Sequence, residues 1–441
     1  MPNALHFFRG ETNLKKIFLT LIFFTMLLFA LLTTASASNY DHCADELKEL
    51  GLFQGTDTGY DLDKPVTRVQ AVTMLVRLLG KEDEAKTNSA LYNVPFSDVP
   101  EWASSYVGYA AQHGLVNGIT ETTFAPDVNC TAQMFATLLL RAMGYDDINS
   151  DDFSYNNALQ FAAEKNILDG YIQSDNSFLR DNMVALSYNA LARDTKDGDM
   201  LLQKLIDEGA VDADIALENI ATFSAYRNIE SALNKVNSLS ALETLTVNTF
   251  SGNTDGTVVL TAEQDIIKKY VSSPSELYYI SIADSYTHGD TTETSTENSY
   301  YSENKVYVEN SLGKFIYNYD SSTLQIGLTV DPLCTIDSIN TKIVSGGNTM
   351  YTIYYESKSL PVGSEFVDEL GNVTVTSLEC SIVLDANLEL VNYNIFLHAT
   401  VVSDSTTYDV LMDSSTTITA TGSTVELELP EDLNEYKQVV G

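Results

Sequence analysis

The amino-acid sequence predicts a multidomain α+β protein, with an N-terminal region rich in helices followed by a C-terminal antiparallel β-sheet. The chain has 441 residues, which is more than one ordinary hydrophobic core accommodates. Apolar residues recur at helical spacing in the first half and alternate at strand spacing in the second half. Arginine stops at Arg227, after which Tyr, Thr and Ser become frequent. Together these changes predict a domain boundary near residue 240.

Residues 1–37 have the layout of a secretory signal peptide. Lys15 and Lys16 precede the apolar run 17–32, and Ala35-Ser36-Ala37 follows as a small-x-small cleavage site. We therefore expect an exported chain that has no stable membrane anchor once the signal is cleaved. An uncleaved anchor is the alternative, because the apolar run is only slightly shorter than a membrane span.

The chain is strongly acidic, with a formal net charge of −37 at pH 7. A negative field of this size repels nucleic acid, so we expect no nucleic-acid partner. The four cysteines form no C-x-x-C pair and no histidine lies at ligand spacing, so we expect no metal site. We expect Cys130 to be buried as a small apolar residue. Cys334 and Cys380 lie in strand-like segments, and a disulfide between them is an open alternative.

A repeat organises the first half of the sequence. Each copy contains a short step that ends in glycine, here called the glycine-bounded step, at 51–55, 114–118 and 166–170; the first two copies also begin with glycine, and the third begins with Asn166. The segment after this step is also repeated, at 60–80, 124–144 and, in a shorter form, 177–193. A single copy is too small to bury both of its faces, so the copies must pack on one another. The sequence therefore predicts three repeats, at 38–86, 94–146 and 150–195.

Each copy is predicted to fold as a helix, a tight turn, an extended connection and a second helix. Thr67 and Thr131 are the expected N-caps of two of the second helices. Asp98 precedes the first helix of the second copy and is expected to cap it. Trp102 has the spacing of the apolar face of that helix, shared with Tyr106. Trp102 therefore anchors a helix core, contacts a ligand, or does both.

The repeat region resembles the S-layer homology (SLH) family. The matching motifs are Phe96-Ser97-Asp98-Val99, Trp102-Ala103, the GLVNG step, Phe124-x-Pro126, and Pro65-Val66-Thr67-Arg68 with Ala71. The resemblance implies a pseudo-threefold bundle of three modules, the second and third of them degenerate, on a Gram-positive cell wall or surface (S-layer). It also implies that grooves between modules bind secondary cell-wall polysaccharide, which is linked to peptidoglycan and often carries pyruvate ketals.

The resemblance and the chemistry of an acidic polysaccharide together suggest one principal site. Arg68 is expected to meet a carboxylate, next to the helix N-terminus at Thr67. Asp98 and Trp102 are expected to form the other wall of the groove, and Arg180 a second, partial site. The second copy has alanine at the arginine position, so its groove lacks this cation. The structural alternatives are a core role for Trp102 and a solvated or salt-bridged Arg68.

The rest of the chain is predicted to contain a helical linker at 196–240 and a β-rich domain at 241–441 with eight or more strands. Residues 285–299 are expected to form a mobile loop. A helix followed by Tyr-rich strands resembles the half-barrels of lipoprotein-carrier-like domains. The curved sheet then either holds a lipid or other hydrophobic ligand, or packs on the helix as an ordinary core.

Catalysis finds little support in the sequence. The histidines are scattered, and the chain has neither a G-x-S-x-G motif nor a phosphate-binding glycine loop. We therefore expect no enzymatic activity, no catalytic residues and no cofactor. The predicted function is that of an exported surface protein held non-covalently on the bacterial cell wall, displaying a β domain. A cell-wall glycoside hydrolase targeted by the modules is an alternative for residues 241–441.

Overall fold

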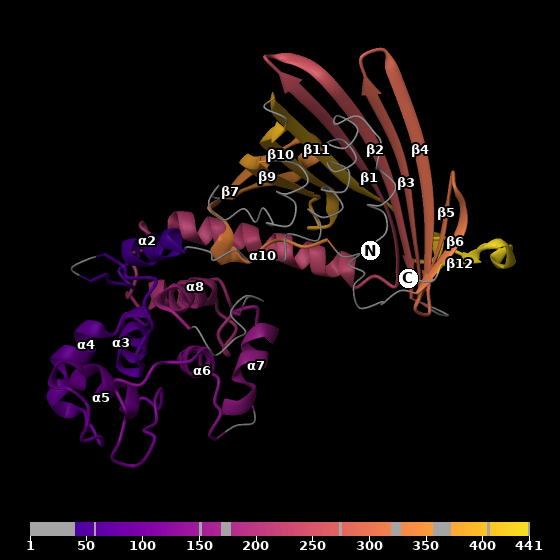
Figure 1. Ribbon diagram of the computed structural model, residues 1–441. Helices are drawn as coiled ribbons and strands as arrows, with labels where there is room; N and C mark the ends of the chain where they lie inside the picture. The colour runs from indigo at the N-terminus through magenta and orange to yellow at the C-terminus, as the bar shows by residue number, and fades with distance from the viewer. Residues whose placement is uncertain are drawn as a thin grey trace. The chain divides into compact units, whose positions relative to one another are not determined.

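The computed structural model describes residues 40–56, 59–149, 152–168, 178–272, 276–318, 328–355, 372–403 and 406–439. The predicted signal segment therefore lies outside the described residues. The chain divides into two compact units. The helical unit contains Ala37–Arg227 together with Pro332–Asp337, and the sheet unit contains Asn228–Asp331 and Ser338–Gly441 (Figure 1).

The helical unit is built from short helices joined by tight turns. Its helices are α2 (Asp41–Glu49), α3 (Arg68–Leu78), α4 (Glu82–Thr87), α5 (Ser104–Gln112), α6 (Ala132–Ala142), α7 (Ala158–Glu164), α8 (Arg180–Leu191), α9 (Leu201–Asp207) and the first part of α10 (Leu217–Asn237). Two 3-10 turns, η3 (Glu101–Ala103) and η4 (Tyr155–Asn157), lead into α5 and α7. The expected helices between 196 and 240 are thus α9 and α10.

The three repeats close into a ring. The second helix of each repeat packs against the first helix of another: α3 on α5, α6 on α7, and α8 on α2. α6 also contacts both α3 and α8, so the second helices meet in the interior. This closed order confirms the predicted pseudo-threefold bundle, and it arises because no repeat alone buries both helix faces.

Backbone contacts repeat the same symmetry. The Arg68 N–H donates to the Val128 carbonyl at 2.9 Å, and the Arg180 N–H donates to the Lys64 carbonyl at 2.9 Å. Lys64 and Val128 occupy equivalent places in the aligned repeats. The start of each of these helices is therefore fixed on the extended connection of a neighbouring repeat.

Local signals set the helix ends as expected. The Thr67 side chain accepts the Gln70 N–H and forms a capping box, and the Thr131 side chain accepts the Met134 N–H. Gly114 has φ +70°, which is the left-handed conformation that terminates α5. Trp102 does not share the buried helix face with Tyr106 as expected, because its side chain is 57% exposed while Tyr106 is buried. It lies in the 3-10 turn η3 rather than in α5, which changes its direction.

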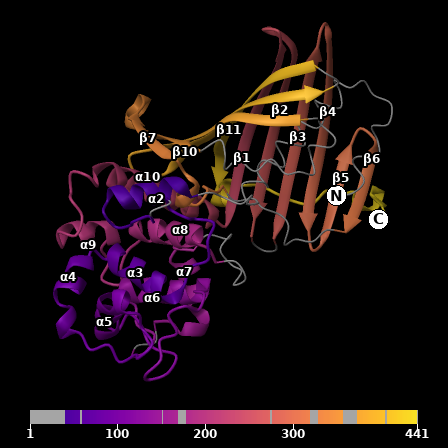
Figure 2. The same ribbon diagram turned by 60° about the vertical axis from the view of Figure 1, so that its left-hand side comes forward.

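The sheet unit is a single sheet of 12 strands in the order β12-β6-β5-β4-β3-β2-β1-β11-β10-β9-β8-β7. The strands are β1 (Ala241–Thr254), β2 (Thr257–Val271), β3 (Leu277–His288), β4 (Thr291–Ser302), β5 (Lys305–Asn310), β6 (Gly313–Asn318), β7 (Ser338–Ile343), β8 (Thr349–Tyr354), β9 (Asn372–Leu384), β10 (Leu390–Ser403), β11 (Thr406–Thr421) and β12 (Lys437–Gln438). All neighbours pair antiparallel except β12, which runs parallel to β6. Figure 1 and Figure 2 show that the sheet is curved. A helical unit together with a mainly antiparallel sheet confirms the predicted α+β class.

Two sequence expectations about the second half were wrong. Residues 285–299 are not a loop, because they form a hairpin of β3 and β4 with register Tyr286↔Glu293. Cross-strand hydrogen bonds such as that between Thr287 and Thr292 stabilise this polar hairpin. Cys334 lies in a 3-10 turn rather than a strand, and all four cysteines are buried and outside any disulfide. The disulfide between Cys334 and Cys380 is therefore absent.

One face of the central strands is buried but partly polar. Ser414, Asn248, Gln264 and Asp284 lie side by side on β11, β1, β2 and β3. The Asn248 amide donates to Gln264 at 2.9 Å, and the Gln264 amide donates to Asp284 at 2.9 Å. Burial raises the pKa of the Asp284 carboxyl. This row interrupts the apolar lining that an acyl-chain site requires.

Candidate functional site

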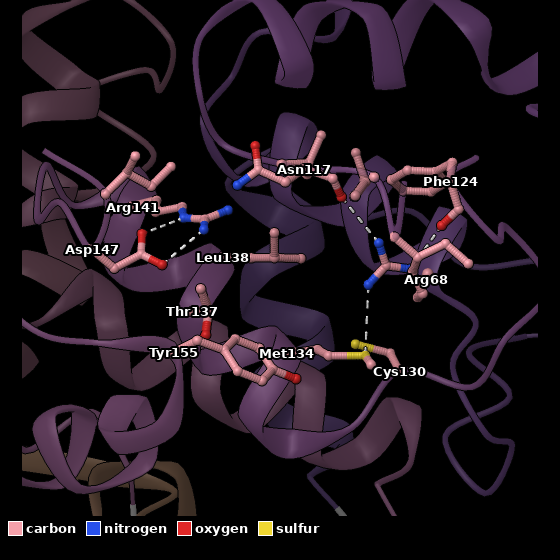
Figure 3. Close-up of a pocket in the computed structure, with 15 residues that line it drawn as sticks. Arg68, Asn117, Phe124, Cys130, Met134, Thr137, Leu138, Arg141, Asp147 and Tyr155 are labelled. Carbon is pink, nitrogen blue, oxygen red and sulfur yellow. Dashed lines mark hydrogen bonds and ion pairs between the residues drawn. The ribbon is translucent and has the colours of Figure 1, made fainter. Parts of the chain in front are cut away.

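A pocket of about 410 Å³ lies in the helical unit (Figure 3). All three repeats contribute to its lining. The first gives Arg68 at the start of α3, the second gives Asn117, Phe124 and Met134, and the third gives Tyr155. The glycine-bounded step and α6 therefore form most of the wall, while the neighbouring repeats supply a cation and an aromatic ring.

Arg68 is held at the pocket by main-chain oxygens. Its Nε donates to the Phe124 carbonyl at 3.1 Å, and its Nη2 donates to the Asn117 carbonyl at 3.2 Å. The guanidinium also lies over the Phe124 ring, 4.8 Å from the ring centroid. Partial burial lowers the pKa of the Arg68 guanidinium, which remains charged at any physiological pH. Within the described part of the chain, Arg68 forms no salt bridge to a carboxylate.

A second arginine lies in the same pocket but is neutralised. Arg141 Nε donates to Asp147 Oδ1 at 2.7 Å, and its Nη2 donates to Asp147 Oδ2 at 2.8 Å. A third bond joins Arg141 to the Leu115 carbonyl at 3.1 Å. This bidentate pair fixes the end of α6, so Arg68 provides the uncompensated positive charge of the pocket (Figure 3).

Asp98 has a different role from the helix cap that was expected. Its two carboxylate oxygens accept the N–H groups of Phe124 and Ala125, both at 2.8 Å. These bonds lower the pKa of the Asp98 carboxyl. The first turn after it, η3, has Pro100 at its N-cap and no side-chain cap. Asp98 thus holds the segment whose carbonyl and ring position Arg68.

The other predicted site residues lie around or away from this pocket. Thr67 caps α3 next to Arg68. Trp102 does not line the pocket, and its side chain is exposed elsewhere on the unit. Arg180 occupies the place in the third repeat that Arg68 has in the first. Its Nε donates to the Tyr60 carbonyl at 2.9 Å, and Tyr60 aligns with Phe124 in the repeat.

Arg68 and Arg180 differ in accessibility. Arg180 is only 9% exposed and its guanidinium lies 5.7 Å from the Phe53 ring centroid. Arg68 is half-buried and lines the pocket. The two arginines therefore make the same backbone contact, but Arg68 is the more accessible of the two and lines a described pocket.

Sequence reasoning missed several lining residues. Asn117 belongs to the repeated glycine-bounded step, so the repeat itself was a usable signal for it. Tyr155 had no such signal, because the third copy lacks the motif around Asp98 and Trp102. Ile119 and Ile148 are 62% and 57% exposed and also line the pocket. An exposed apolar rim of this kind suits the non-polar face of a bound ring.

Within the described residues, no group of three or more His, Cys, Asp or Glu side chains is placed to hold a metal ion. No helix among those residues is long and apolar enough to cross a membrane.

The S-layer homology domain family matches residues 95–131. The chain is 30% identical over 151 residues to the middle cell wall protein of Brevibacillus brevis, covering 34% of this chain and 14% of that protein. It is 31% identical over 125 residues to the surface layer protein of Brevibacillus choshinensis, covering 27% and 11%. An endoglucanase of a Bacillus species is 35% identical over 101 residues, covering 23% and 10%. The chain thus spans only a small part of these relatives.

Among solved structures, LprF from Mycobacterium bovis matches 47% of this chain and 97% of its own, with 11% identity and a TM-score of 0.26. The family match lies on the repeat that forms most of the pocket wall, and the relatives named above are mainly surface proteins. The chain therefore carries an S-layer homology domain and is an exported protein of the bacterial cell surface.

Proposed function

We propose that the helical unit attaches the chain non-covalently to the cell wall by binding secondary cell-wall polysaccharide in the pocket at Arg68. One observation carries the proposal. In a chain of net charge −37, Arg68 lines a pocket with its guanidinium turned to carbonyl oxygens and an aromatic ring, and no carboxylate of the described residues neutralises it. A carboxylate on the polymer supplies the missing anion, and a pyruvate ketal is the substituent of that kind.

The arrangement supports binding rather than catalysis. Among the described residues, the pocket offers the Arg68 cation, which has no carboxylate partner, the side-chain amide of Asn117 and an apolar rim. These groups suit a charged sugar, whose hydroxyls accept and donate hydrogen bonds while its ring packs on apolar surface. Arg180 is proposed as a partial second site, weaker because its side chain is buried.

The proposal is tested by co-sedimentation of the chain from residue 38 onward with purified sacculi that retain their polymer. Arg68→Ala is expected to weaken binding roughly 10- to 100-fold, because a charge-assisted hydrogen bond contributes about 1.5–3 kcal/mol. Arg227→Ala is the matched control, since Arg227 pairs with the half-exposed Asp194 away from the pocket. Mild acid removes ketal-linked pyruvate from the sacculi. Binding to sacculi treated in this way tests whether the pyruvate ketal is the substituent that Arg68 meets.

Equal binding to sacculi stripped of polymer contradicts the proposal, as does full binding by Arg68→Ala. Arg68→Lys separates charge from geometry, because lysine keeps the positive charge but lacks the planar fork. We expect it to bind between wild type and Arg68→Ala. Thermal unfolding of each variant confirms that the bundle is intact.

For the sheet unit we propose display at the surface. A glycosidase needs two carboxyl groups flanking the scissile bond. The buried polar row contains one acid, Asp284, whose oxygens are engaged by Gln264 and Ser295. The same row places polar groups where a carrier of acyl chains needs an apolar wall. Hydrolysis and lipid carriage therefore stay secondary to display.

A further inference from the structure

Tyr155 lies at the mouth of the pocket on a turn of the third repeat. It is 45% exposed although it lines the pocket, so a large part of its ring is open to solvent. Figure 3 shows its ring on the Met134 side of the pocket, across from Asn117, with Arg68 on the neighbouring wall. An exposed aromatic ring bordering a pocket is the element that stacks on the apolar face of a sugar.

The turn that carries Tyr155 is held rigidly. The Ser154 N–H and hydroxyl both donate to the Asn157 side chain, at 2.6 and 3.1 Å. Phe153, just before them, is buried and stacks on Phe161 with ring centroids 5.6 Å apart. The Gln133 side-chain amide donates to the Tyr155 carbonyl, which ties the turn to the start of α6. A pre-positioned ring loses little conformational freedom when a ligand binds.

Trp102 and Tyr155 lie in corresponding turns of successive repeats, although at different places within the turn. Each lies in the 3-10 turn that opens the first helix of its repeat, η3 before α5 and η4 before α7. Only Tyr155 faces the pocket that contains Arg68, since Trp102 is absent from its lining. The exposed aromatic ring of this pocket therefore comes from the repeat that has lost the family's tryptophan motif, whereas Phe124 of the second repeat is buried.

We propose that Tyr155 is the aromatic platform of the polysaccharide site, stacking on the sugar ring whose carboxylate meets Arg68. This inference rests on the proposed binding function and deepens it. The site is then composite, with its cation in the first repeat, its wall in the second and its ring in the third. The third repeat, whose motifs are degenerate, then contributes directly to binding in addition to its structural role.

The test measures sacculus binding of the chain from residue 38 onward with substitutions at Tyr155. Tyr155→Ala is expected to weaken binding roughly 3- to 10-fold, the effect of losing one aromatic stacking contact. Tyr155→Phe and Tyr155→Trp are expected to bind within about twofold of wild type, because both retain a ring. Trp102→Ala is the matched control, since it removes an exposed aromatic side chain from the equivalent turn.

The outcomes separate this inference from the function on which it rests. If the wild-type protein fails to bind sacculi, the proposed binding function itself is wrong, whatever the role of Tyr155. If Arg68→Ala abolishes binding while Tyr155→Ala leaves it unchanged, polysaccharide binding stands and the role of Tyr155 is wrong. A larger loss in Trp102→Ala than in Tyr155→Ala also overturns the inference. Because Tyr155 is half-exposed, its variants are expected to unfold at the wild-type temperature.

Discussion

Arg68 and Arg141 show how the same residue type takes two roles in one pocket. Arg141 donates through Nε and Nη2 to the carboxylate of Asp147, and this pair secures the end of α6. Arg68 instead donates to the carbonyls of Asn117 and Phe124. These oxygens carry only partial negative charges, so they do not neutralise the full positive charge of the guanidinium. The difference lies in what the neighbouring loop offers, and for this reason Arg68 is the residue that we propose to meet an anion.

Asp98 is expected to stabilise the bundle by holding a strained turn. It accepts the N–H groups of Phe124 and Ala125, and Ala125 has φ +59°, a conformation unfavourable for a residue with a Cβ. Asp98→Ala should therefore lower the melting temperature of the chain. Asp127→Ala, which removes an exposed carboxylate from the same loop, should leave it unchanged. Equal melting temperatures for the two variants contradict this role.

The pH dependence of the Asp98 effect has a defined sign. Its pKa is lowered in the folded state from an ordinary value of 3.8 by the two backbone N–H groups. The stabilisation is then fully present above pH 3.8 and is lost as the pH falls through the folded pKa. The difference in melting temperature between wild type and Asp98→Ala should accordingly shrink below about pH 3.8.

The helices were predictable where their ends depend on near neighbours. Thr67 and Thr131 cap α3 and α6 because their hydroxyls reach N–H groups three residues away. The start of α8 is different, since Leu179 occupies the cap position and Asp181 is the second residue of the helix. Asp181 accepts the Tyr40 N–H at 2.8 Å across the ring of repeats. That contact joins residues 141 positions apart, which no local pattern reveals.

Asp181 should make the bundle less stable as the pH rises. Burial raises the pKa of its carboxyl to about 6 from 3.8, so the folded state binds the proton more tightly than the unfolded state. Its contribution to stability is greatest below pH 3.8 and declines as the pH rises to about 6. Asp181→Asn keeps an acceptor for Tyr40 but cannot ionise.

Urea unfolding between pH 4 and pH 7.5 measures this effect. The free energy of unfolding of Asp181→Asn relative to wild type should increase across that range, and should level off above the folded pKa. A constant difference between the two proteins across the range shows that Asp181 does not titrate as described.

The strands were predictable as a set, because alternation of side chains at period two marks each of them. The hairpin of β3 and β4 was not predicted, because its residues from Thr291 to Thr296 are polar and exposed. An exposed polar strand has no alternation to detect, and its stability comes from pairing with β3. Pairing is a property of the neighbouring strand and not of the segment itself.

One segment connects distant parts of the sequence within the helical unit. Pro332–Asp337 belongs to this unit although it follows the strand β6 in the chain. Asn189 in α8 binds it, accepting the Cys334 N–H at 3.0 Å while its amide donates to the Ile167 carbonyl at 3.3 Å. Asn189 is 2% exposed, so both contacts are shielded from water.

Asn189→Ala should lower the free energy of unfolding of the helical unit by about 1–3 kcal/mol, since it leaves buried backbone groups without partners. The reaction of the Cys334 thiol with an alkylating reagent should also become faster. Chemical denaturation and peptide mapping of the labelled cysteines measure the two effects. Asn149→Ala, at an exposed turn, is the matched control. An unchanged labelling rate at Cys334 contradicts the anchoring role of Asn189.

The sequence by itself determined the three repeats, the helix caps at Thr67 and Thr131, the strand-rich second half and the place of Arg68 at a helix start. These features depend on residues within a few positions of each other or on a motif that recurs along the chain. Only the tertiary structure decided that Tyr155 faces the pocket while Trp102 does not, and that Asp98 holds a turn. The physical reason is that the packing of helices from three repeats brings Arg68 and Tyr155 to one pocket, and sequence spacing does not encode that packing.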